Sequence, residues 1–310
     1  MAQHKTALTV VIPSKDRPER LLNAVKSILP ELTAPDRIIV VDDASSTPLE
    51  IGLRDGLTHE ENAVLTVLRN ETPQRPGGAR NVGVQAASTP YIVFLDDDDA
   101  LAQGYLAALR AYWQSADGAD YGYSATTNTH GLTSDGTFEP LPVRPSRRHM
   151  FPLSLGVWVS RTAFLEVGGL RAELTTNEDT EFGVNLKRHG LTGVFFSGAG
   201  VIINPNPSNG STEIQSEAPS ITKSVNARHR AECFAQILTI HAPYLNTPDA
   251  DAFRNFCMRR MLELSAKAKQ PFDIPDAIAR GLSCAQMLKW RLVFYANRVA
   301  RSLADFSKGS

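Results

Sequence analysis

The sequence predicts an α/β protein with an open, mostly parallel sheet flanked by helices and followed by a helical C-terminal extension. Two observations carry this prediction. Short apolar runs rich in β-branched residues alternate with amphipathic segments over the first hundred residues. These runs are continuously apolar, which is typical of parallel strands buried on both faces. The predicted strands are residues 7–12, 37–41, 63–68 and 91–95.

The segments between the strands have helical spacing. Pro18 stands where a first helical residue belongs, and apolar residues then recur every three or four positions until Pro30. Further helices are predicted over residues 77–87, 102–113 and about 179–189. A strand–helix–strand alternation of this kind places helices on both faces of the sheet.

The C-terminal part has a different pattern. Residues from about 221 onward are predominantly helical, with prolines that divide the segments. We therefore predict an α/β domain over residues 1–220, with halves of about 1–115 and 116–220, and a helical region over 221–310. The 310 residues are 42% hydrophobic, which is enough for a sizeable core.

Composition excludes several function classes. Thirty-two Lys and Arg residues balance 33 Asp and Glu residues, so no nucleic-acid partner is expected. Cys233, Cys257 and Cys284 are widely spaced and form no C-x-x-C pair. We predict that they are small buried side chains in a reducing compartment. The first residues lack the apolar segment of a signal peptide, so a cytoplasmic protein is expected.

Polar residues follow three of the four predicted strands, at the sheet edge where ligands bind in α/β folds. These residues are Pro13, Ser14 and Arg17 after the first strand, Asp42 and Asp43 after the second, and Asp96, Asp97, Asp98 and Asp99 after the fourth. Carboxylate oxygens suit Mg²⁺ or Mn²⁺ that bridges to phosphates. The ordinary alternative is a solvated loop or a helix start. Acids at two strand ends on one rim favour the metal site.

Several motifs resemble those of family 2 glycosyltransferases of the GT-A fold. In chain order they are V-V-I-P-S-K-D-R-P, I-V-V-D-D-A-S-S, G-G-A-R-N-V-G, Y-I-V-F-L-D-D-D-D, and V-G-G-L followed by N-E-D-T-E-F. They extend over residues 7 to about 205 and are specific only together. The resemblance implies inverting transfer of a single sugar from a nucleoside-diphosphate sugar, by default a UDP-sugar. The implied acceptor is a hydroxyl on a glycan or a lipid-linked oligosaccharide.

The resemblance also implies roles for individual residues. Asp96 and Asp98 match the D-x-D pair, with Asp98 as the direct ligand of Mn²⁺ or Mg²⁺ and Asp96 nearer the ribose. The positions that match the donor-binding loops are Pro13, Ser14, Arg17, Asp42, Asp43, Arg80, Asp96 and Asp97. Glu178 and Asp179 match the acceptor-side acidic pair, in which Asp179 is the general base.

Ordinary structural roles compete with these assignments. Arg17 and Arg80 would otherwise form surface ion pairs, and the acidic pair at 178–179 would be a common helix start. The sequence leaves open which of Asp42 and Asp43 reads the base. Many family members carry a histidine after the strand that follows the acceptor helix. Here Asn204 begins a segment without histidine, which leaves the third metal ligand open.

The helix predicted over residues 285–306 mixes apolar and basic side chains. This composition is compatible with a peripheral contact to an anionic membrane, at its inner face. The alternative is a helix packed on the catalytic domain with its basic side in water. Residues 286–290 are one substitution from the Q-x-x-R-W motif of processive synthases, but no membrane helices accompany them. Transfer of a single sugar is therefore expected, and the oligomeric state stays open.

Two other functions compete with glycosyl transfer. The first is an inactive GT-A-fold module that only binds carbohydrate or nucleotide, since a fold alone does not fix function. Retention of both acidic clusters argues against it. The second is a nucleotidyltransferase, which usually needs a glycine-rich first loop that the P-S-K-D segment does not offer.

Overall fold

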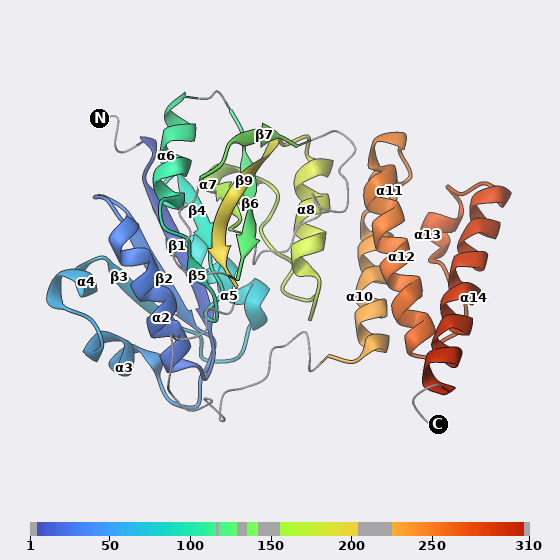
Figure 1. Ribbon diagram of the computed structural model, residues 1–310, viewed down its shortest axis with the longest axis horizontal. Helices are drawn as coiled ribbons and strands as arrows, with labels where there is room; N and C mark the ends of the chain where they lie inside the picture. The colour runs from blue at the N-terminus through green and yellow to red at the C-terminus, as the bar shows by residue number, and fades with distance from the viewer. Residues whose placement is uncertain (1–4, 116–117, 129–134, 142–155, 204–224, 307–310) are drawn as a thin grey trace. The chain divides into compact units, whose positions relative to one another are not determined.

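The computed structural model of the protein describes residues 5–115, 118–128, 135–141, 156–203 and 225–306 (Figure 1). The chain divides into two compact units, each with its own hydrophobic core. The first unit contains the sheet. The second contains the C-terminal helices together with residues 174–188, which the sequence analysis assigned to the α/β domain. The predicted boundary near residue 220 lies outside the described residues.

Among the described residues, nine strands form one sheet in the order β3-β2-β1-β4-β8-β6-β9-β5, with β7 paired to β9. The strands are β1 Leu8–Ser14, β2 Arg37–Asp42, β3 Leu65–Arg69, β4 Tyr91–Phe94, β5 Ala100–Leu101, β6 Tyr121–Thr127, β7 Phe138–Pro140, β8 Trp158–Ser160 and β9 Gly193–Ile202. The four predicted strands are parallel neighbours, which confirms the predicted half of the sheet. The other half is mixed, because β8 runs antiparallel to β4 and β6, and β5 and β7 run antiparallel to β9.

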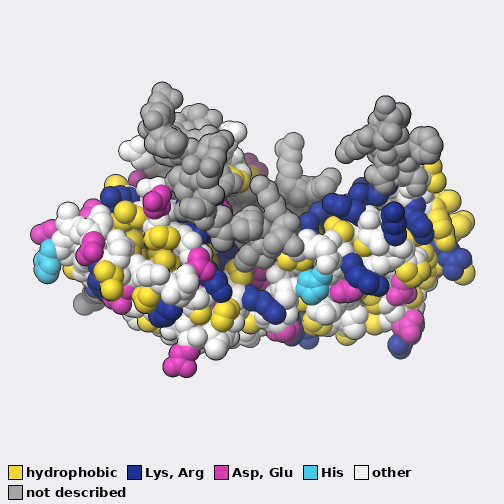
Figure 2. Space-filling model, turned by 90° about the horizontal axis from the view of Figure 1, so that it is seen from below, with side chains coloured by type: hydrophobic (Ala, Val, Ile, Leu, Met, Phe, Trp, Pro, Cys, Tyr) yellow, Lys and Arg dark blue, Asp and Glu magenta, His cyan; other side chains and the backbone are white. Residues whose placement is uncertain are grey.

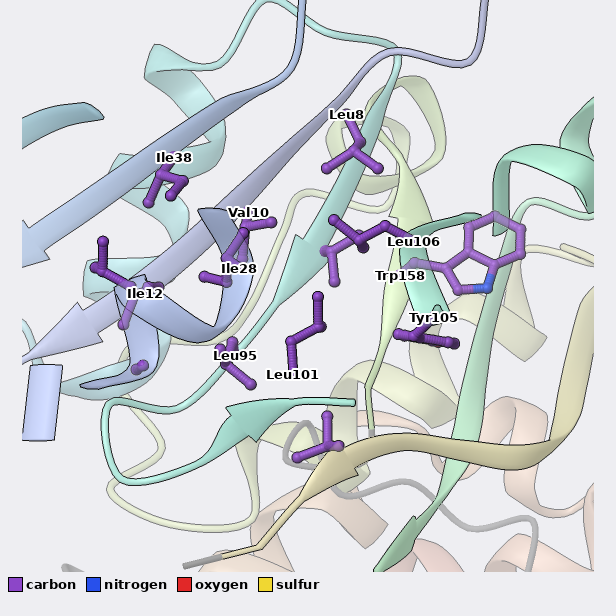
Figure 3. Close-up of a cluster of buried hydrophobic side chains, with 14 of the residues drawn as sticks. Leu8, Val10, Ile12, Ile28, Ile38, Leu95, Leu101, Tyr105, Leu106 and Trp158 are labelled. Carbon is purple, nitrogen blue, oxygen red and sulfur yellow. The ribbon is translucent and has the colours of Figure 1, made fainter. Parts of the chain in front are cut away.

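Helices cover both faces of the parallel strands. They are α2 Pro18–Ile28, α3 Leu49–Asp55, α4 His59–Ala63, α5 Arg75–Ala86, α6 Tyr105–Ser115 and α7 Arg161–Glu166. On one face, Leu8, Val10 and Ile12 of β1 share a core with Ile28 of α2 and Leu106 of α6 (Figure 3). Alternate side chains of a strand point to opposite faces, and the other face of β1 packs on α5.

The contact between α5 and β1 depends on a glycine. A Cβ added at Gly83 would lie 2.4 Å from Cγ1 of Val11, far inside van der Waals contact. This close approach holds α5 against the sheet. All seven residues of β1 are buried, so the side chains that follow the strand are the first that can meet a ligand.

The second unit is helical. Its helices are α8 Glu178–Arg188, α10 Ala227–Ile240, α11 Ala242–Leu245, α12 Asp251–Lys267, α13 Asp276–Ala279 and α14 Cys284–Phe306. Val184 of α8 shares a core with Phe234, Met258 and Trp290 of the longer helices. The prediction that all three cysteines are buried is wrong for Cys284, which is exposed at the start of α14. Within the described part of the chain, no helix is both long and apolar enough to cross a bilayer.

Candidate functional site

Three strand ends meet at one edge of the sheet, as the sequence predicts. The hydroxyl of Ser14, the last residue of β1, donates a hydrogen bond to Oδ2 of Asp97 at 2.7 Å. Arg17 donates to Oδ1 of the same carboxylate at 3.0 Å. The backbone N–H of Asp43 donates to the carbonyl of Ser14 at 2.8 Å, which joins the loop after β2. Pro13 is buried in β1, opposite Val41.

The four aspartates after β4 face different ways. The backbone N–H of Asp99 donates to the carbonyl of Asp96 at 3.2 Å and closes a turn. Asp96, Asp98 and Asp99 each offer a carboxylate oxygen, and these oxygens lie within 4.8 Å of one another. Asp97 points instead toward the β1 loop, and burial raises its pKa to about 6. Its carboxylate therefore holds two loops together, a different role from the donor contact predicted for it.

Three arginines lie beside the aspartates. Arg17 and Arg20, at the start of α2, contact Asp98 at 3.2 and 3.6 Å. Arg80 of α5 contacts Asp96 at 2.5 Å. The side chains of Arg17 and Arg80 are only 12% and 5% exposed, so neither forms an ordinary surface pair. Burial and the neighbouring charge of Asp96 raise the pKa of Asp98.

A divalent cation fits this group of side chains. The donors are hard carboxylate oxygens, which Mn²⁺ and Mg²⁺ prefer. Burial and, after it, repulsion by the charge of Asp96 raise the pKa of Asp98. A bound cation would relieve that repulsion. Asn204, the position at which a further ligand was left open, lies outside the described residues.

Asp42 is committed to the fold of its own loop. Its side chain is 1% exposed and accepts hydrogen bonds from the backbone N–H of Ser45 at 2.8 Å and of Leu49 at 3.2 Å. Arg69 of β3 also donates to it and bonds the carbonyl of Ser45 at 2.7 Å. Asp42 is therefore a structural residue that shapes the loop after β2.

Asp43 is arranged differently. Its Oδ1 accepts from Nδ2 of Asn70 at 2.8 Å and from the backbone N–H of Gln74 at 2.7 Å. Its Oδ2 accepts no hydrogen bond from any residue in the described ranges. Since both oxygens of the Asp42 carboxylate are used and one oxygen of Asp43 is not, Asp43 is the acid of this pair that retains an acceptor for a ligand.

We expect Asp42→Asn to destabilise the first unit by about 2–4 kcal/mol at pH 7, because donors would then face the new amide NH₂. Burial raises the pKa of Asp42, but hydrogen bonds from Ser45, Leu49 and Arg69 outweigh it and leave the pKa below 3.8. The stabilisation is therefore complete above that pH and is lost as the pH falls through the lower, folded-state pKa. Urea unfolding should show that the difference in free energy of unfolding between the unmodified protein and Asp42→Asn shrinks as the pH falls through this range. Asp55→Asn, at an exposed position, serves as control. A difference in free energy of unfolding that does not change with pH would contradict the structural role of Asp42.

Glu178 and Asp179 lie in the first turn of α8, both half-buried. Oδ1 of Asp179 accepts from the backbone N–H of Thr180 at 2.6 Å. Burial and the charge of Arg260 lower the pKa of Arg230 in α10, whereas the charge of Asp179 acts in the opposite direction. Asp179 thus lies near a cation within the helical unit, and it also serves as an acid at a helix start.

A buried contact between a histidine and a glutamate holds the start of α8 to the end of α10. Nε2 of His241 lies 2.6 Å from Oε1 of Glu181, and both side chains are 0% exposed. Glu181 is two residues from Asp179 and belongs to the same helical turn. The pair therefore fixes the segment that carries the predicted base.

We expect His241→Ala to lower the free energy of unfolding by about 3–5 kcal/mol, because it would remove a close polar partner from the fully buried Glu181 carboxylate. Urea denaturation measures this cost. Combining it with Glu181→Gln should cost less than the sum of the two single changes, since the residues are in contact. Additive effects would show that the pair contributes no coupling energy.

Comparison with known proteins identifies the family of the domain that carries this edge of the sheet. Residues 9–152, which contain all three strand-end loops, match the family described as Glycosyl transferase family 2. These residues form a family 2 glycosyltransferase domain. The GT-A fold predicted for it is confirmed by two solved structures. TarS of S. aureus, in complex with UDP-GlcNAc, has a TM-score of 0.58 at 17% identity, over 93% of this chain and 79% of that one.

The second structure is the mannosyltransferase PcManGT of Pyrobaculum calidifontis, solved with GDP-Man and Mn²⁺. It has a TM-score of 0.55 at 16% identity, over 98% of this chain and 88% of that one. At these identities the likeness shows the fold alone.

Two of the relatives that match by sequence are named as a glycosyltransferase and a glucosyltransferase. An uncharacterized glycosyltransferase of Haemophilus influenzae is 23% identical over 56% of this chain and 60% of its own length. The GalNAc(5)-diNAcBac-PP-undecaprenol beta-1,3-glucosyltransferase of Campylobacter jejuni is 34% identical over 33% of each chain. The aligned part therefore spans less than two thirds of either relative.

Three residues at this edge had no individual role in the sequence analysis, although Asp99 was named there as part of the aspartate run. Asp99 joins the acidic group because a turn brings residues three apart together. Arg20 lies in the first turn of α2, three positions after the N-cap residue Arg17, a spacing that places both on one side of the helix. These two signals were readable in the sequence. No local signal pointed to Arg69 as the partner of Asp42, because the contact depends on the neighbouring strand.

Proposed function

We propose that the protein is an inverting glycosyltransferase that moves a single sugar from a nucleoside-diphosphate sugar to an acceptor hydroxyl. The carboxylates of Asp96, Asp98 and Asp99, gathered within 4.8 Å at the ligand-binding edge of the sheet, carry this proposal. A UDP-sugar is the default donor, and the UDP-GlcNAc complex of TarS supports that choice. The name of the Campylobacter jejuni relative supports a lipid-linked acceptor over a free glycan.

The loops after β1 and β2 bind the nucleotide in this proposal. Oδ2 of Asp43 accepts a hydrogen bond from the base, because its Oδ1 is already occupied by Asn70 and Gln74. Ser14 keeps the β1 loop in place through its bond to Asp97. Arg80, buried beside Asp96, reaches the nucleotide from the middle of α5. These residues bind and orient the donor before transfer.

Asp96, Asp98 and Asp99 are the residues that would hold Mn²⁺ or Mg²⁺. When bound, such a cation neutralises the charge that develops on the leaving diphosphate. Asp98 is the direct ligand in this proposal, and Asp96 lies nearer the ribose. In this proposal Asp99 supplies the third metal ligand, a role that a histidine has in many members of the family. The Mn²⁺ complex of PcManGT supports this choice of metal.

Asp179 acts as general base and accepts the proton of the acceptor hydroxyl. The hydroxyl oxygen then forms the new bond to the anomeric carbon while the bond to the diphosphate breaks, so a single displacement inverts that centre. Glu178 shares this helical turn on the acceptor side. The Glu181–His241 pair fixes the turn and limits the ways in which the base can move.

Donor turnover tests the proposal directly. The purified chain is incubated with Mn²⁺ and, separately, UDP-glucose, UDP-GlcNAc and GDP-mannose, with and without an undecaprenyl-diphosphate-linked oligosaccharide fraction. Release of nucleoside diphosphate and the anomeric configuration of the product are measured. We expect one donor to be consumed with inversion. Tight donor binding without turnover would indicate an inactive binding module, and release of pyrophosphate from a nucleoside triphosphate would indicate a nucleotidyltransferase.

A further inference from the structure

Helix α14 carries apolar side chains on two opposite faces. Trp290 and Phe294 are 2% and 0% exposed and belong to the core of the helical unit. On the other side, Leu288, Leu292, Tyr295 and Val299 are 55–63% exposed. Their spacing of four, three and four residues places them in one row along the helix. The row is therefore not part of the core.

This row is unusual for the protein. Six large hydrophobic side chains are exposed among the described residues, and four of them form this row. The other two, Ile51 and Leu165, stand singly on other elements. Single exposed apolar residues are ordinary, whereas a contiguous row points to a surface that meets something apolar.

Cations flank the row on both sides. At 3.6 residues per turn, Lys289 falls on one side of it, and Arg291 and Arg298 fall on the other. The Lys289 ammonium lies 5.2 Å from the centroid of the Trp290 ring, and the Arg298 guanidinium lies 6.0 Å from that of Phe294. The buried aromatic side chains thus hold these cations beside the row.

The charge on this face is of one sign. The sequence has no Asp or Glu from residue 284 to residue 301. Lys289 and Arg291 form no ion pair with any residue that the structure describes. Dark blue side chains lie beside yellow ones over the C-terminal helices in Figure 2. A second copy of the chain would set these cations against its own, whereas lipid phosphates would neutralise them.

We propose that the row of Leu288, Leu292, Tyr295 and Val299 docks on the surface of a bilayer rich in anionic lipid. The apolar side chains enter the boundary between headgroups and acyl chains, and the flanking cations contact lipid phosphates, with the helix axis along the surface. This corrects the mixed apolar face that the sequence suggested, because Trp290 and Phe294 are committed to the core. The proposal does not depend on glycosyl transfer.

Vesicle flotation of the full chain tests this proposal. We expect recovery with vesicles of phosphatidylcholine and phosphatidylglycerol, and little with phosphatidylcholine alone. The triple variant Leu288→Ser, Leu292→Ser, Val299→Ser should bind the mixed vesicles roughly tenfold more weakly or worse. The matched control Ile51→Ser, Leu165→Ser removes exposed apolar side chains elsewhere and should bind like the unmodified protein. Thermal unfolding should be unchanged, since every substituted side chain is exposed or at the surface.

A second variant tests the electrostatic part. Lys289→Gln, Arg291→Gln should lose much of the preference for anionic vesicles. Equal flotation of the triple variant and the unmodified protein would overturn the proposal, as would equal binding to neutral and anionic vesicles. A dimer that the triple variant abolishes, without vesicle binding, would also overturn it and assign the row to contact between copies. Sugar transfer to a soluble acceptor should persist in both variants, which separates this test from that of the catalytic proposal.

Discussion

Asp179→Asn is expected to lower the rate of sugar transfer by about 10²–10⁴-fold while donor binding stays unchanged. The amide keeps the size of the side chain but does not accept the proton of the acceptor hydroxyl. Transfer is measured under saturating donor and acceptor, and donor affinity by calorimetry. The loss should appear in kcat, because the base acts in the transition state.

The matched control is Asp273→Asn, an exposed carboxylate of the same helical unit that is not among the residues assigned to the site. It should transfer sugar at the unmodified rate. Thermal unfolding guards against a trivial loss, since an acid in the first turn of α8 contributes up to about 1 kcal/mol to the helix. A folded Asp179→Asn protein with undiminished kcat would remove Asp179 as the base and leave Glu178 as the remaining acid of that pair.

Loss of the Asp98 carboxylate should be comparably severe. We expect Asp98→Ala to lower transfer by roughly 10²–10³-fold, because stabilisation of the leaving group by a bound cation is worth several kcal/mol. Chelation of divalent ions should silence the unmodified enzyme, and Mn²⁺ should restore it. The variant should respond weakly to added Mn²⁺.

A readout besides activity keeps this prediction independent of the donor. Added Mn²⁺ should raise the unfolding temperature of the unmodified protein, since a ligand that binds only the folded state stabilises it. Asp98→Ala should lose that shift, and the exposed Asp55→Asn should retain it. An equal Mn²⁺-induced shift in all three proteins would place the cation elsewhere.

The parallel half of the sheet was predictable because its signal is local. A strand buried on both faces must be continuously apolar, and the polar residues that follow it must lie at the sheet edge. Ser14, Asp43 and the aspartate run were found in this way. The antiparallel half was not found, since short strands such as Trp158–Ser160 are set by their neighbours and carry little periodicity of their own.

The direction of individual side chains was beyond the sequence. The sequence does not distinguish the four consecutive aspartates. In the structure a turn brings Asp96 and Asp99 together, and the side chain of Asp97 bonds the β1 loop instead. Asp42 and Asp43 are likewise adjacent, and it is the bonds from the folded loop and from Arg69 on β3 that separate the structural acid from the one with an open oxygen. The contact between Glu181 and His241 spans 60 residues and has no local signature.

The carboxylate of Asp97 fastens the end of β1 to the turn that gathers the other three acids. Occupancy of one side is therefore expected to be thermodynamically linked to occupancy of the other. If a bound ion raises the affinity for the nucleotide by some factor, a bound nucleotide raises the affinity for the ion by the same factor. Donor and ion would then bind cooperatively, so the cellular concentration of either one would affect how fully both sites are occupied.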